Sequence, residues 1–443
     1  MLGRDTPHIN RIVSDGFMCP LEGVAPAVTC TAQSSMLTGL PASGHGVVAN
    51  GWYFRDLAEV FFWRQSNSLV QGEKVWEQAK KRKADFRCSV LFWWHNMYSS
   101  VDHSVTLRPI YPADGRKIPA LYSHPQGLHE RLEEHLGGFP YFNFWGPGSN
   151  IKSSEWIAKA AMLEFEWNRP DLQLVYLPHL DYNLQRLGPK DPAISGDLRE
   201  IDRVVGALAE HVRARGAEVM IVSEYGIESV SRPIHINRIL REHGYVSVRK
   251  TLGWELLDCG ASRAFAVADH QVAHIYVRNP EDIANVTRLL ESTPGVEMVL
   301  GAEGKKHWQL DHERSGELVA IAEGNAWFTY YYWFDDKHAP DFARTVDIHR
   351  KPGYDPAELF VDPELPFPLA KIAFNRIKKM LGFRMLMDVI PLNPGLVRGS
   401  HGRPAAGIDE GPLLICSSPE FAADRYLMTD VKELILRSVF TGQ

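Results

Sequence analysis

Short apolar runs alternate with amphipathic helical patterns along much of the chain. Three runs rich in β-branched and aromatic residues, at 88–94 (CSVLFWW), 172–181 (LQLVYLPHLD) and 217–226 (AEVMIVSEYG), have the composition of buried strands. Between the last two, apolar residues spaced by three and four positions predict a helix over 195–216. This alternation predicts an α/β fold with a central, mostly parallel sheet sandwiched by helices.

The pattern changes after residue 261. The runs AFAVADHQVAHIYV, PEDIANVTRLLEST, GVEMVLG and GELVAIAEG are typical of a strand, a helix and two further strands. We therefore expect a smaller α+β lobe or insertion at 262–335, attached to a core made of residues 1–261 and 336–443. His270 and His274 fall in the first of these runs, and we interpret them as structural.

Composition and charge narrow the class of protein. The 443 residues carry a net charge of −6 and are 45% hydrophobic and 23% charged, as in soluble globular proteins. Because a nucleic-acid surface needs a concentrated basic face, none is expected. Five scattered cysteines without a CxxC pair, and the lack of a signal-peptide pattern or a membrane-length apolar run, predict a cytoplasmic protein. No pattern in the chain indicates an oligomeric state.

Aromatic residues cluster at 52–63, 91–100 and 141–148. These clusters either line one wall of a cleft or pack in the core. As a cleft wall they would hold a planar or apolar group, with Trp52 in contact and with Arg55 or Arg64 paired to a phosphate.

The stretch PAVTCTAQSSMLTGLPASGHGV at 26–47 crowds hydroxyl groups at the start of a predicted helix. Taken alone, Thr29 fits a helix N-cap, whose hydroxyl bonds a backbone N–H of the first turn. A threonine nucleophile needs activation by a base or a metal ion, and a helix N-terminus suits an anionic phosphate. Thr29 is therefore a candidate nucleophile if the chain supplies metal ligands elsewhere.

Candidate metal ligands follow two of the predicted strands and lie in one late glycine-flanked loop. Chemistry gathers at the carboxyl ends of strands in α/β sheets, and oxygen and imidazole ligands from separate strand ends can hold zinc or a similar dication. The motifs are YLPHLDYNLQRLGP with His179, Asp181 and Gln185, VSEYGI with Glu224 and Tyr225, and GLVRGSHGRP with His401.

In this order, the motifs resemble those of the type I phosphodiesterase/nucleotide pyrophosphatase branch of the alkaline phosphatase superfamily. DTPHINRI is similar to the family's TPNLDRL. The stretches quoted above that contain Thr29 and Asp181 also resemble family motifs. SEYG stands where the family has SDHG, and RGSHGR stands where its last metal histidine occurs. The resemblance covers nearly the whole chain. It implies an alkaline phosphatase-like core in which a threonine attacks phosphorus while two metal ions bind the nucleophile and the phosphoryl oxygens.

Carried over by position, the resemblance makes Thr29 the nucleophile and Asp181, Glu224 and His401 metal ligands. His349, in DIHRKPGYDP, competes with His401 because the neighbouring Gly-Tyr-Asp is similar to the family's nucleotidase members.

The chain also departs from the family pattern. Gln185 and Tyr225 stand where the family has imidazole ligands, which makes them candidates for substrate contact instead. The family's first metal aspartate follows an N-terminal strand, and this sequence begins just after that point. His179, two residues before Asp181, is expected on the same side of the strand and is a substitute ligand.

These patterns predict a metal-dependent phosphodiesterase or nucleotide pyrophosphatase-like hydrolase that acts on a small organic phosphoester. We expect one or two divalent ions, Zn²⁺ or Mn²⁺, in its site. The alternative is a family member that binds a phosphorylated ligand or a partner without turnover, which the replaced imidazoles favour. A sulfatase is disfavoured because Cys30 is followed by TAQS and lacks a CxPxR context.

Overall fold

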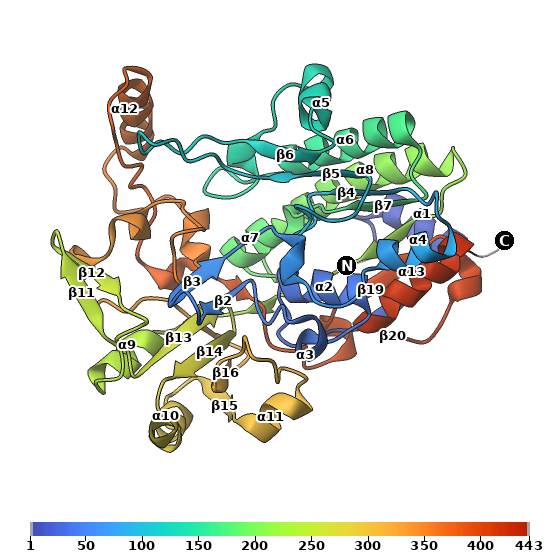
Figure 1. The fold of residues 1–443 in the computed structure, drawn as a ribbon. Coiled ribbons are helices and arrows are strands. Elements are labelled where there is room, and N and C mark those ends of the chain that lie inside the picture. Colours follow the sequence, from blue (N-terminus) through green and yellow to red (C-terminus); the bar gives the residue numbers. More distant parts are fainter. Residues whose placement is uncertain (1–2, 441–443) are drawn as a thin grey trace.

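Two four-stranded sheets form the centre of the fold in the computed structural model, which describes residues 3–440 (Figure 1). The order of the first sheet is β6 (Leu121–His124), β5 (His103–Leu107), β4 (Cys88–Leu91) and β7 (Leu172–Val175). The order of the second is β20 (Tyr426–Leu427), β1 (Phe17–Glu22), β19 (Leu413–Cys416) and β8 (Met220–Val222). β4 is parallel to β5 and β7, whereas β19 is antiparallel to β1 and β8. The α/β fold is confirmed, and its strand pairing is more mixed than the alternating pattern predicts.

Helices pack against these sheets from two sides. Val90 and Leu91 of β4 point into different apolar clusters, as successive strand residues do. The first cluster includes residues of α2 (Thr29–Thr38), α4 (Val75–Arg82) and α13 (Val431–Phe440). The second includes residues of α5 (Leu128–Leu136) and α6 (Lys152–Asn168). A further helix, α8 (Ile194–Arg213), packs against α6 and contacts α1 (Pro7–Asp15) and α7 (His179–Leu187).

Residues 264–322 form a separate antiparallel sheet. Its order is β13 (Ala264–Asp269), β14 (Val272–Val277), β16 (Leu318–Ala322) and β15 (Val296–Leu300), and helices α9 (Ile236–Glu242), α10 (Pro280–Glu291) and α11 (Ala302–His307) contact it. The run 264–277 is a hairpin, not the single strand expected, because the polar residues Asp269, His270 and Gln271 occupy its turn. The boundaries 262 and 335 of a distinct lobe stay a prediction.

The remaining helices and strands are short or lie at the surface. They are α3 (Ala42–His45), the hairpins β2 (Gly51–Phe54)/β3 (Glu59–Phe62) and β11 (Val248–Thr251)/β12 (Trp254–Leu257), and the pairs β9 (Glu228–Ser229)/β18 (Gly399–Ser400) and β10 (Arg232–Ile234)/β17 (Ala326–Phe328). One helix, α12 (Pro368–Met380), projects from the upper left of the molecule in Figure 1. Within residues 3–440, no helix has both the length and the apolarity needed to cross a bilayer.

The strand expected at 172–181 is shorter than its apolar pattern suggests. β7 ends at Val175, and α7 begins at His179 directly after Pro178. A proline that precedes the first helical turn cannot supply a ladder N–H, so the strand ends before it. The segment that carries His179 and Asp181 is therefore helical, and the expectation that both side chains lie on one side of a strand is wrong.

A buried ionic cluster holds the segment that carries Tyr354. Lys351 is 1% exposed, and its Nζ lies 2.6 Å from Asp355 Oδ2 and 2.7 Å from Glu358 Oε1. The other Glu358 oxygen accepts a hydrogen bond from Trp145 Nε1 at 2.7 Å. The charge of Lys351 thus compensates two buried carboxylates. Glu358 also connects residues 351–358 to Trp145.

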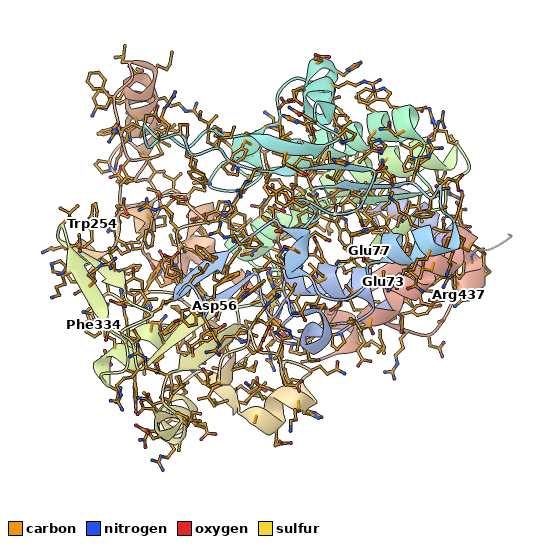
Figure 2. All side chains as sticks on the ribbon, in the orientation of Figure 1. Asp56, Glu73, Glu77, Trp254, Phe334 and Arg437 are labelled. Carbon is orange, nitrogen blue, oxygen red and sulfur yellow. The ribbon has the colours of Figure 1, made fainter. Side chains whose placement is uncertain are left out.

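We predict that Lys351→Met destabilises the protein by about 3–5 kcal/mol, because it leaves Asp355 and Glu358 as unpaired buried charges. Urea unfolding of the purified chain measures this loss. The matched control is Lys81→Met, which removes an exposed lysine paired with Glu73 and is expected to change stability little. Glu73 is labelled at the surface in Figure 2. Equal stability of the two variants would contradict the prediction.

Candidate active site

Thr29 is the first residue of α2, a helix whose ten residues are all buried. The N-cap position belongs to Val28, and no side chain caps the helix. The Thr29 hydroxyl does not make the capping bond that an N-cap reading requires; its Oγ1 lies 3.0 Å from the hydroxyl of Tyr225. The hydroxyl is therefore turned toward residues that follow β8.

Tyr225 joins Thr29 to Asp181. Its hydroxyl donates to Asp181 Oδ1 and Oδ2 at 3.2 and 3.3 Å. Because this bond uses the only phenolic proton, Thr29 is the donor in the Thr29–Tyr225 bond. Asp181 lies in the first turn of α7, so the chain of hydrogen bonds connects the start of α2, the end of β8 and the start of α7.

His401 is anchored to the residues that lead into α2. Its Nδ1 lies 2.7 Å from the Ala27 carbonyl, and Ala27 N donates to the Gly402 carbonyl at 2.8 Å. The carbonyl contact places the proton on Nδ1 and leaves a lone pair on Nε2. Nε2 is buried and has no hydrogen-bond partner. Burial also lowers the pKa of His401 to about 3, so the imidazole is neutral.

Four rings stack in a column beside Thr29. The ring centroids of Tyr225 and His401 are 3.6 Å apart with planes at 7°, and those of His401 and His270 are 3.6 Å apart. Tyr354 covers the other face of His270 at 3.7 Å and donates its hydroxyl proton to Gln185 Oε1 at 2.8 Å. The column therefore fixes both Tyr225 and the amide of Gln185.

Glu224 lies close to Thr29, where a glutamine of α2 holds it, and it is not part of the lining of the adjacent cavity. Gln33 Nε2 donates to Glu224 Oε1 at 2.6 Å, and Gln33 Oε1 accepts the backbone N–H of Trp94 at 2.8 Å. Burial raises the pKa of Glu224 to about 8, against the lowering effect of its bond to Gln33. Burial likewise raises the pKa of Asp181 to about 7, against its bonds to Tyr225 and Gln185. Both carboxyls lack a neighbouring cation, so desolvation dominates.

A cavity opens beside these residues. Thr29, Asp181, Tyr225, His270 and His401 line its floor. Its walls are mostly aromatic and apolar, and among the described residues Lys117 is the only Lys or Arg in the lining. The aromatic wall members are Trp63, Trp94, Tyr141, Phe144, Trp145, Tyr176, Tyr182 and Tyr354. Such a cavity, apolar with a few convergent polar groups, is typical of a small-molecule site.

Comparisons with known proteins show which family the chain belongs to. The family model described as type I phosphodiesterase/nucleotide pyrophosphatase matches residues 1–355. The chain belongs to the type I phosphodiesterase/nucleotide pyrophosphatase family. A pyrophosphatase/phosphodiesterase of Schizosaccharomyces pombe is 23% identical over 46% of this chain and 37% of its own length. A bis(5'-adenosyl)-triphosphatase of Xenopus laevis is 24% identical over 72% of this chain and 61% of its own length. The chain thus spans less than two thirds of these relatives.

The fold is also that of solved structures. A phosphonoacetate hydrolase of Sinorhizobium meliloti superimposes with a TM-score of 0.61 over 98% of this chain and 90% of its own, at 14% identity. At this identity the likeness establishes the fold alone, and it confirms the alkaline phosphatase-like α/β core expected of a phosphodiesterase-family chain.

Not every residue predicted for the phosphodiesterase-family site reaches the cavity. The Arg55 guanidinium is bound by Glu317 at 2.9 Å and by the Ser315 carbonyl, and Trp52 is 2% exposed within a cluster that includes Cys30 and Val47. Neither residue lines the cavity, whereas Trp63 and Trp94 of the same aromatic clusters do. We therefore leave Arg55 and Trp52 out of the candidate site.

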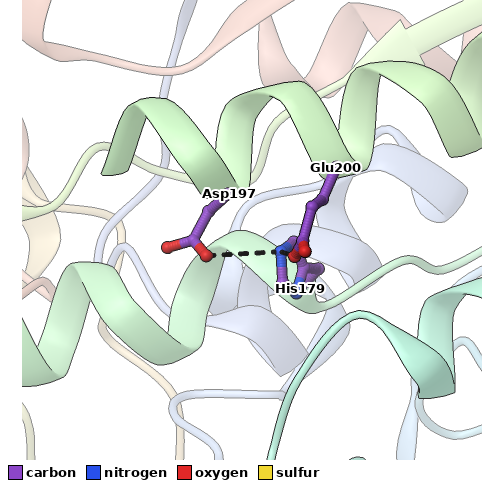
Figure 3. Close-up of side chains that lie close together, drawn as sticks. All are labelled: His179, Asp197 and Glu200. Carbon is purple, nitrogen blue, oxygen red and sulfur yellow. Dashed lines mark ion pairs between the residues drawn. The ribbon is translucent and has the colours of Figure 1, made fainter. Parts of the chain in front are cut away.

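The two further histidines considered as ligands also point elsewhere. His179 Nε2 lies 3.2 Å from Glu200 and 3.6 Å from Asp197, both on α8 (Figure 3). Two residues apart on a helix, side chains diverge by about 200°, which explains why His179 and Asp181 face opposite ways. His349 Nδ1 lies 3.4 Å from the Phe62 carbonyl and outside the cavity lining. Of the two candidates for the last position, His401 is the one that lies beside Thr29.

The side chains around Thr29 supply donor atoms for a divalent cation, but in the described part of the chain Asp181, Glu224 and His401 do not form a preassembled three-ligand site. Asp181, Glu224 and the free Nε2 of His401 are suitable ligands, whereas the Gln185 carbonyl oxygen accepts from Tyr354, and the Tyr225 hydroxyl lies between Thr29 and Asp181. Within residues 3–440, the only three His, Cys, Asp or Glu side chains whose ligand atoms all lie within 4.8 Å of one another are His179, Asp197 and Glu200. A two-ion centre is therefore not preformed around Thr29.

His270, which the sequence led us to interpret as structural, lines the cavity. This residue has a φ of +60° in the β13–β14 turn, and its ring stacks between His401 and Tyr354 in the cavity floor. The polar triplet Asp-His-Gln inside an apolar run was the available signal, because a polar interruption of two strand patterns indicates a turn. His274 of the same run is structural as expected, with its Nε2 3.0 Å from the Val48 carbonyl.

Asp269 supports the first turn of α2 through Asn50. Asn50 Oδ1 accepts the Cys30 N–H at 3.0 Å, and Asn50 N and Nδ2 donate to the Asp269 carboxyl at 2.8 and 3.2 Å. Burial raises the pKa of Asp269 from 3.8 to about 7, against the lowering effect of the Asn50 bonds.

We predict that Asp269→Asn removes a pH dependence of folding. Because the folded pKa of Asp269 lies above its unfolded value, the folded protein binds a proton that the unfolded chain releases, so this carboxyl favours folding less as pH rises from about 4 to 7. Urea unfolding at pH 5 and pH 8 measures the effect. The stability of the wild type relative to Asp269→Asn should fall between these pH values. A difference independent of pH would contradict the assignment.

Proposed function

We propose that this chain is a phosphoric ester hydrolase of the phosphodiesterase/pyrophosphatase type, with Thr29 as its nucleophile. The observation that carries the proposal is the position of the Thr29 hydroxyl. It lies at the first residue of a buried helix, 3.0 Å from the Tyr225 hydroxyl, and on the floor of an apolar cavity. The positive end of a helix dipole at Thr29 suits the phosphoryl group that would bind there.

The hydrogen bonds from Thr29 to Tyr225 and from Tyr225 to Asp181 provide a route by which the Thr29 proton leaves. As Thr29 Oγ1 bonds to phosphorus, its proton passes to Tyr225, and the phenolic proton passes to Asp181 along the 3.0 and 3.2 Å contacts. The phosphorus–oxygen bond to the leaving group breaks, and the departing oxygen takes up the proton that Thr29 released to Asp181. A water molecule then attacks the phosphothreonine, its oxygen bonds to phosphorus as the bond to Thr29 breaks, one of its protons returns to Thr29, and phosphate or a monoester is released.

One divalent cation, Zn²⁺ or Mn²⁺, would be held by Asp181, Glu224 and His401. When bound, such an ion supplies positive charge that stabilises the phosphoryl oxygens. Gln185 and Tyr225 contribute in another way. Tyr225 orients Thr29, and Gln185, fixed by Tyr354, directs its amide toward Asp181 and lowers the pKa of that carboxyl.

The cavity favours a small phosphoester with an apolar or planar substituent. Trp63 and Trp94, whose ring centroids are 4.7 Å apart, line the wall near Thr29. Lys117, the only Lys or Arg among the described residues of the lining, is the candidate partner for a phosphate group. Its Nζ also lies 3.5 Å from Asp347. Stacking on indole and phenol rings would contribute most of the binding free energy of the substituent.

A binding protein without turnover is the second candidate function. Tyr225 and Gln185 favour it, because neither side chain replaces the imidazole of a metal ligand. In that case the same cavity would retain a phosphorylated ligand, and Thr29 would act as a hydrogen-bond donor to it.

We predict that Thr29→Ala lowers the rate of hydrolysis of a chromogenic phosphodiester by about a thousandfold or more, because the nucleophile is removed. Thr29→Ser should retain a measurable rate. The matched control is Thr38→Ala in the same helix, whose hydroxyl bonds the Ser34 carbonyl, and it should hydrolyse at nearly the wild-type rate. Equal rates in the wild type and Thr29→Ala would refute the nucleophile, and binding of the diester with no turnover in the wild type would favour the binding protein.

We predict that Tyr225→Phe lowers kcat by about ten- to a hundredfold and changes KM little. The substitution keeps the ring that stacks on His401 but removes the hydroxyl between Thr29 and Asp181, a hydrogen bond to a carboxylate worth about 1.5–3 kcal/mol. Steady-state kinetics with the same diester measures both constants. An unchanged kcat would show that the proton of Thr29 leaves by another route.

A further inference from the structure

The helix α12 exposes apolar side chains on the face turned away from the protein. Large hydrophobic residues between Phe367 and Phe383 are 54–86% exposed, and the most prominent are Phe367, Leu369, Phe374, Ile377, Met380 and Phe383. Soluble proteins rarely expose a contiguous apolar surface of this kind unless it binds something. The helix therefore presents a surface that the rest of the chain leaves uncovered.

The opposite face of α12 attaches it to the protein. Ile372 packs against an apolar cluster that contains Ala357, Val389 and Ile390. Lys371 Nζ donates to the Asp388 carbonyl at 2.9 Å, and Asn375 is 8% exposed. These contacts use only one face of α12. The helix is thus already packed against the protein, and its exposed apolar face takes no part in that packing. Figure 1 shows α12 standing clear of the layered core.

The charge of this segment has a single sign. Residues 366–387 contain five Lys or Arg residues, at 371, 376, 378, 379 and 384, and no Asp or Glu. Lys371 is paired with Asp388, which directly follows this range, at 2.9 Å. Arg376 and Arg384 are exposed, and Lys378 Nζ lies 4.4 Å above the Phe374 ring, so cations flank the apolar face. The whole chain carries a net charge of −6, which makes this a local concentration of positive charge on an acidic protein.

A neighbouring connection also exposes apolar residues. The residues between β5 and β6 reach toward α12 in Figure 1, and Ile110 and Tyr111 in this connection are 54% and 52% exposed. Asp114 of the connection is close enough to Arg384 to be affected by its charge. The connection between β5 and β6 therefore lies near the segment that follows α12.

We propose that α12 docks the protein on the surface of an anionic phospholipid bilayer. Phe374, Ile377 and Met380 enter the boundary between headgroups and acyl chains, while Arg376, Lys378 and Arg384 bind lipid phosphates. A helix with an apolar face flanked by Lys and Arg lies in the membrane interface without spanning it, and its binding depends on anionic lipid. A second copy of the chain is a poorer occupant, because two α12 faces would bring like charges together.

The test is co-sedimentation of the full chain with vesicles of phosphatidylcholine alone or mixed with phosphatidylserine. The protein should sediment with the mixed vesicles and much less with pure phosphatidylcholine, and added salt should release it. The double variant Arg376→Glu/Lys378→Glu should weaken binding at least about tenfold, since each basic residue near an anionic surface contributes about 1 kcal/mol. Phe374→Ser/Met380→Ser should weaken binding to the mixed vesicles by a similar factor.

The control is Leu252→Ser, which removes an equally exposed apolar residue from the β11–β12 hairpin and should leave vesicle binding unchanged. Thermal unfolding of all variants should match the wild type, because the substituted side chains do not attach α12 to the core. Failure of the wild type to bind anionic vesicles, or equal binding by the α12 variants, would overturn the proposal. A concentration-dependent dimer that is abolished by Phe374→Ser/Met380→Ser would overturn it in favour of self-association.

Discussion

The candidate site depends on one connection, the attachment of the start of α2 to the loop at His401. The Ala27 carbonyl contacts His401 Nδ1, and the Ala27 N–H bonds the Gly402 carbonyl, so a short loop near the end of the chain is joined to residues near its beginning. This connection places the His401 ring against Tyr225, and Tyr225 in turn reaches Thr29 and Asp181. It thus adds the loop at His401 to the hydrogen bonds that already join α2, the residues after β8 and α7.

The stacked column gives the cavity floor its chemical character. Neutral imidazoles lie between phenol rings, and the carboxyls of Asp181 and Glu224 are desolvated beside them. An added positive charge, from a cation or from the helix N-terminus at Thr29, would therefore be favourable there. Tyr225 and Gln185 give this family member hydrogen bonds where the family pattern has imidazoles. The proposed role of Tyr225 in orienting Thr29 follows from that replacement.

Much of the fold and part of the candidate site could be predicted from the sequence, for reasons that individual residues make clear. Thr29, Glu224 and His401 were found because each lies in a short motif with polar or glycine residues at the edge of an apolar run. His179 was misplaced because the run 172–181 hides the end of β7 and the start of a helix at Pro178. His270 was interpreted as structural because the two apolar strands of the β13–β14 hairpin, joined by a short turn, have the sequence pattern of one long strand. Arg55 and Trp52 could not be placed, because only tertiary packing decides which face of the β2–β3 hairpin meets the cavity.

The central claim is that Thr29 attacks phosphorus, and trapping of the intermediate tests it most directly. Acid quenching during turnover of a chromogenic phosphodiester, followed by proteolysis and mass spectrometry, locates any covalent phosphoryl group. We expect a phosphorylated peptide that contains Thr29 in the wild type and none in Thr29→Ala. Turnover with no phosphorylated Thr29 peptide, or an adduct on another residue, would contradict it.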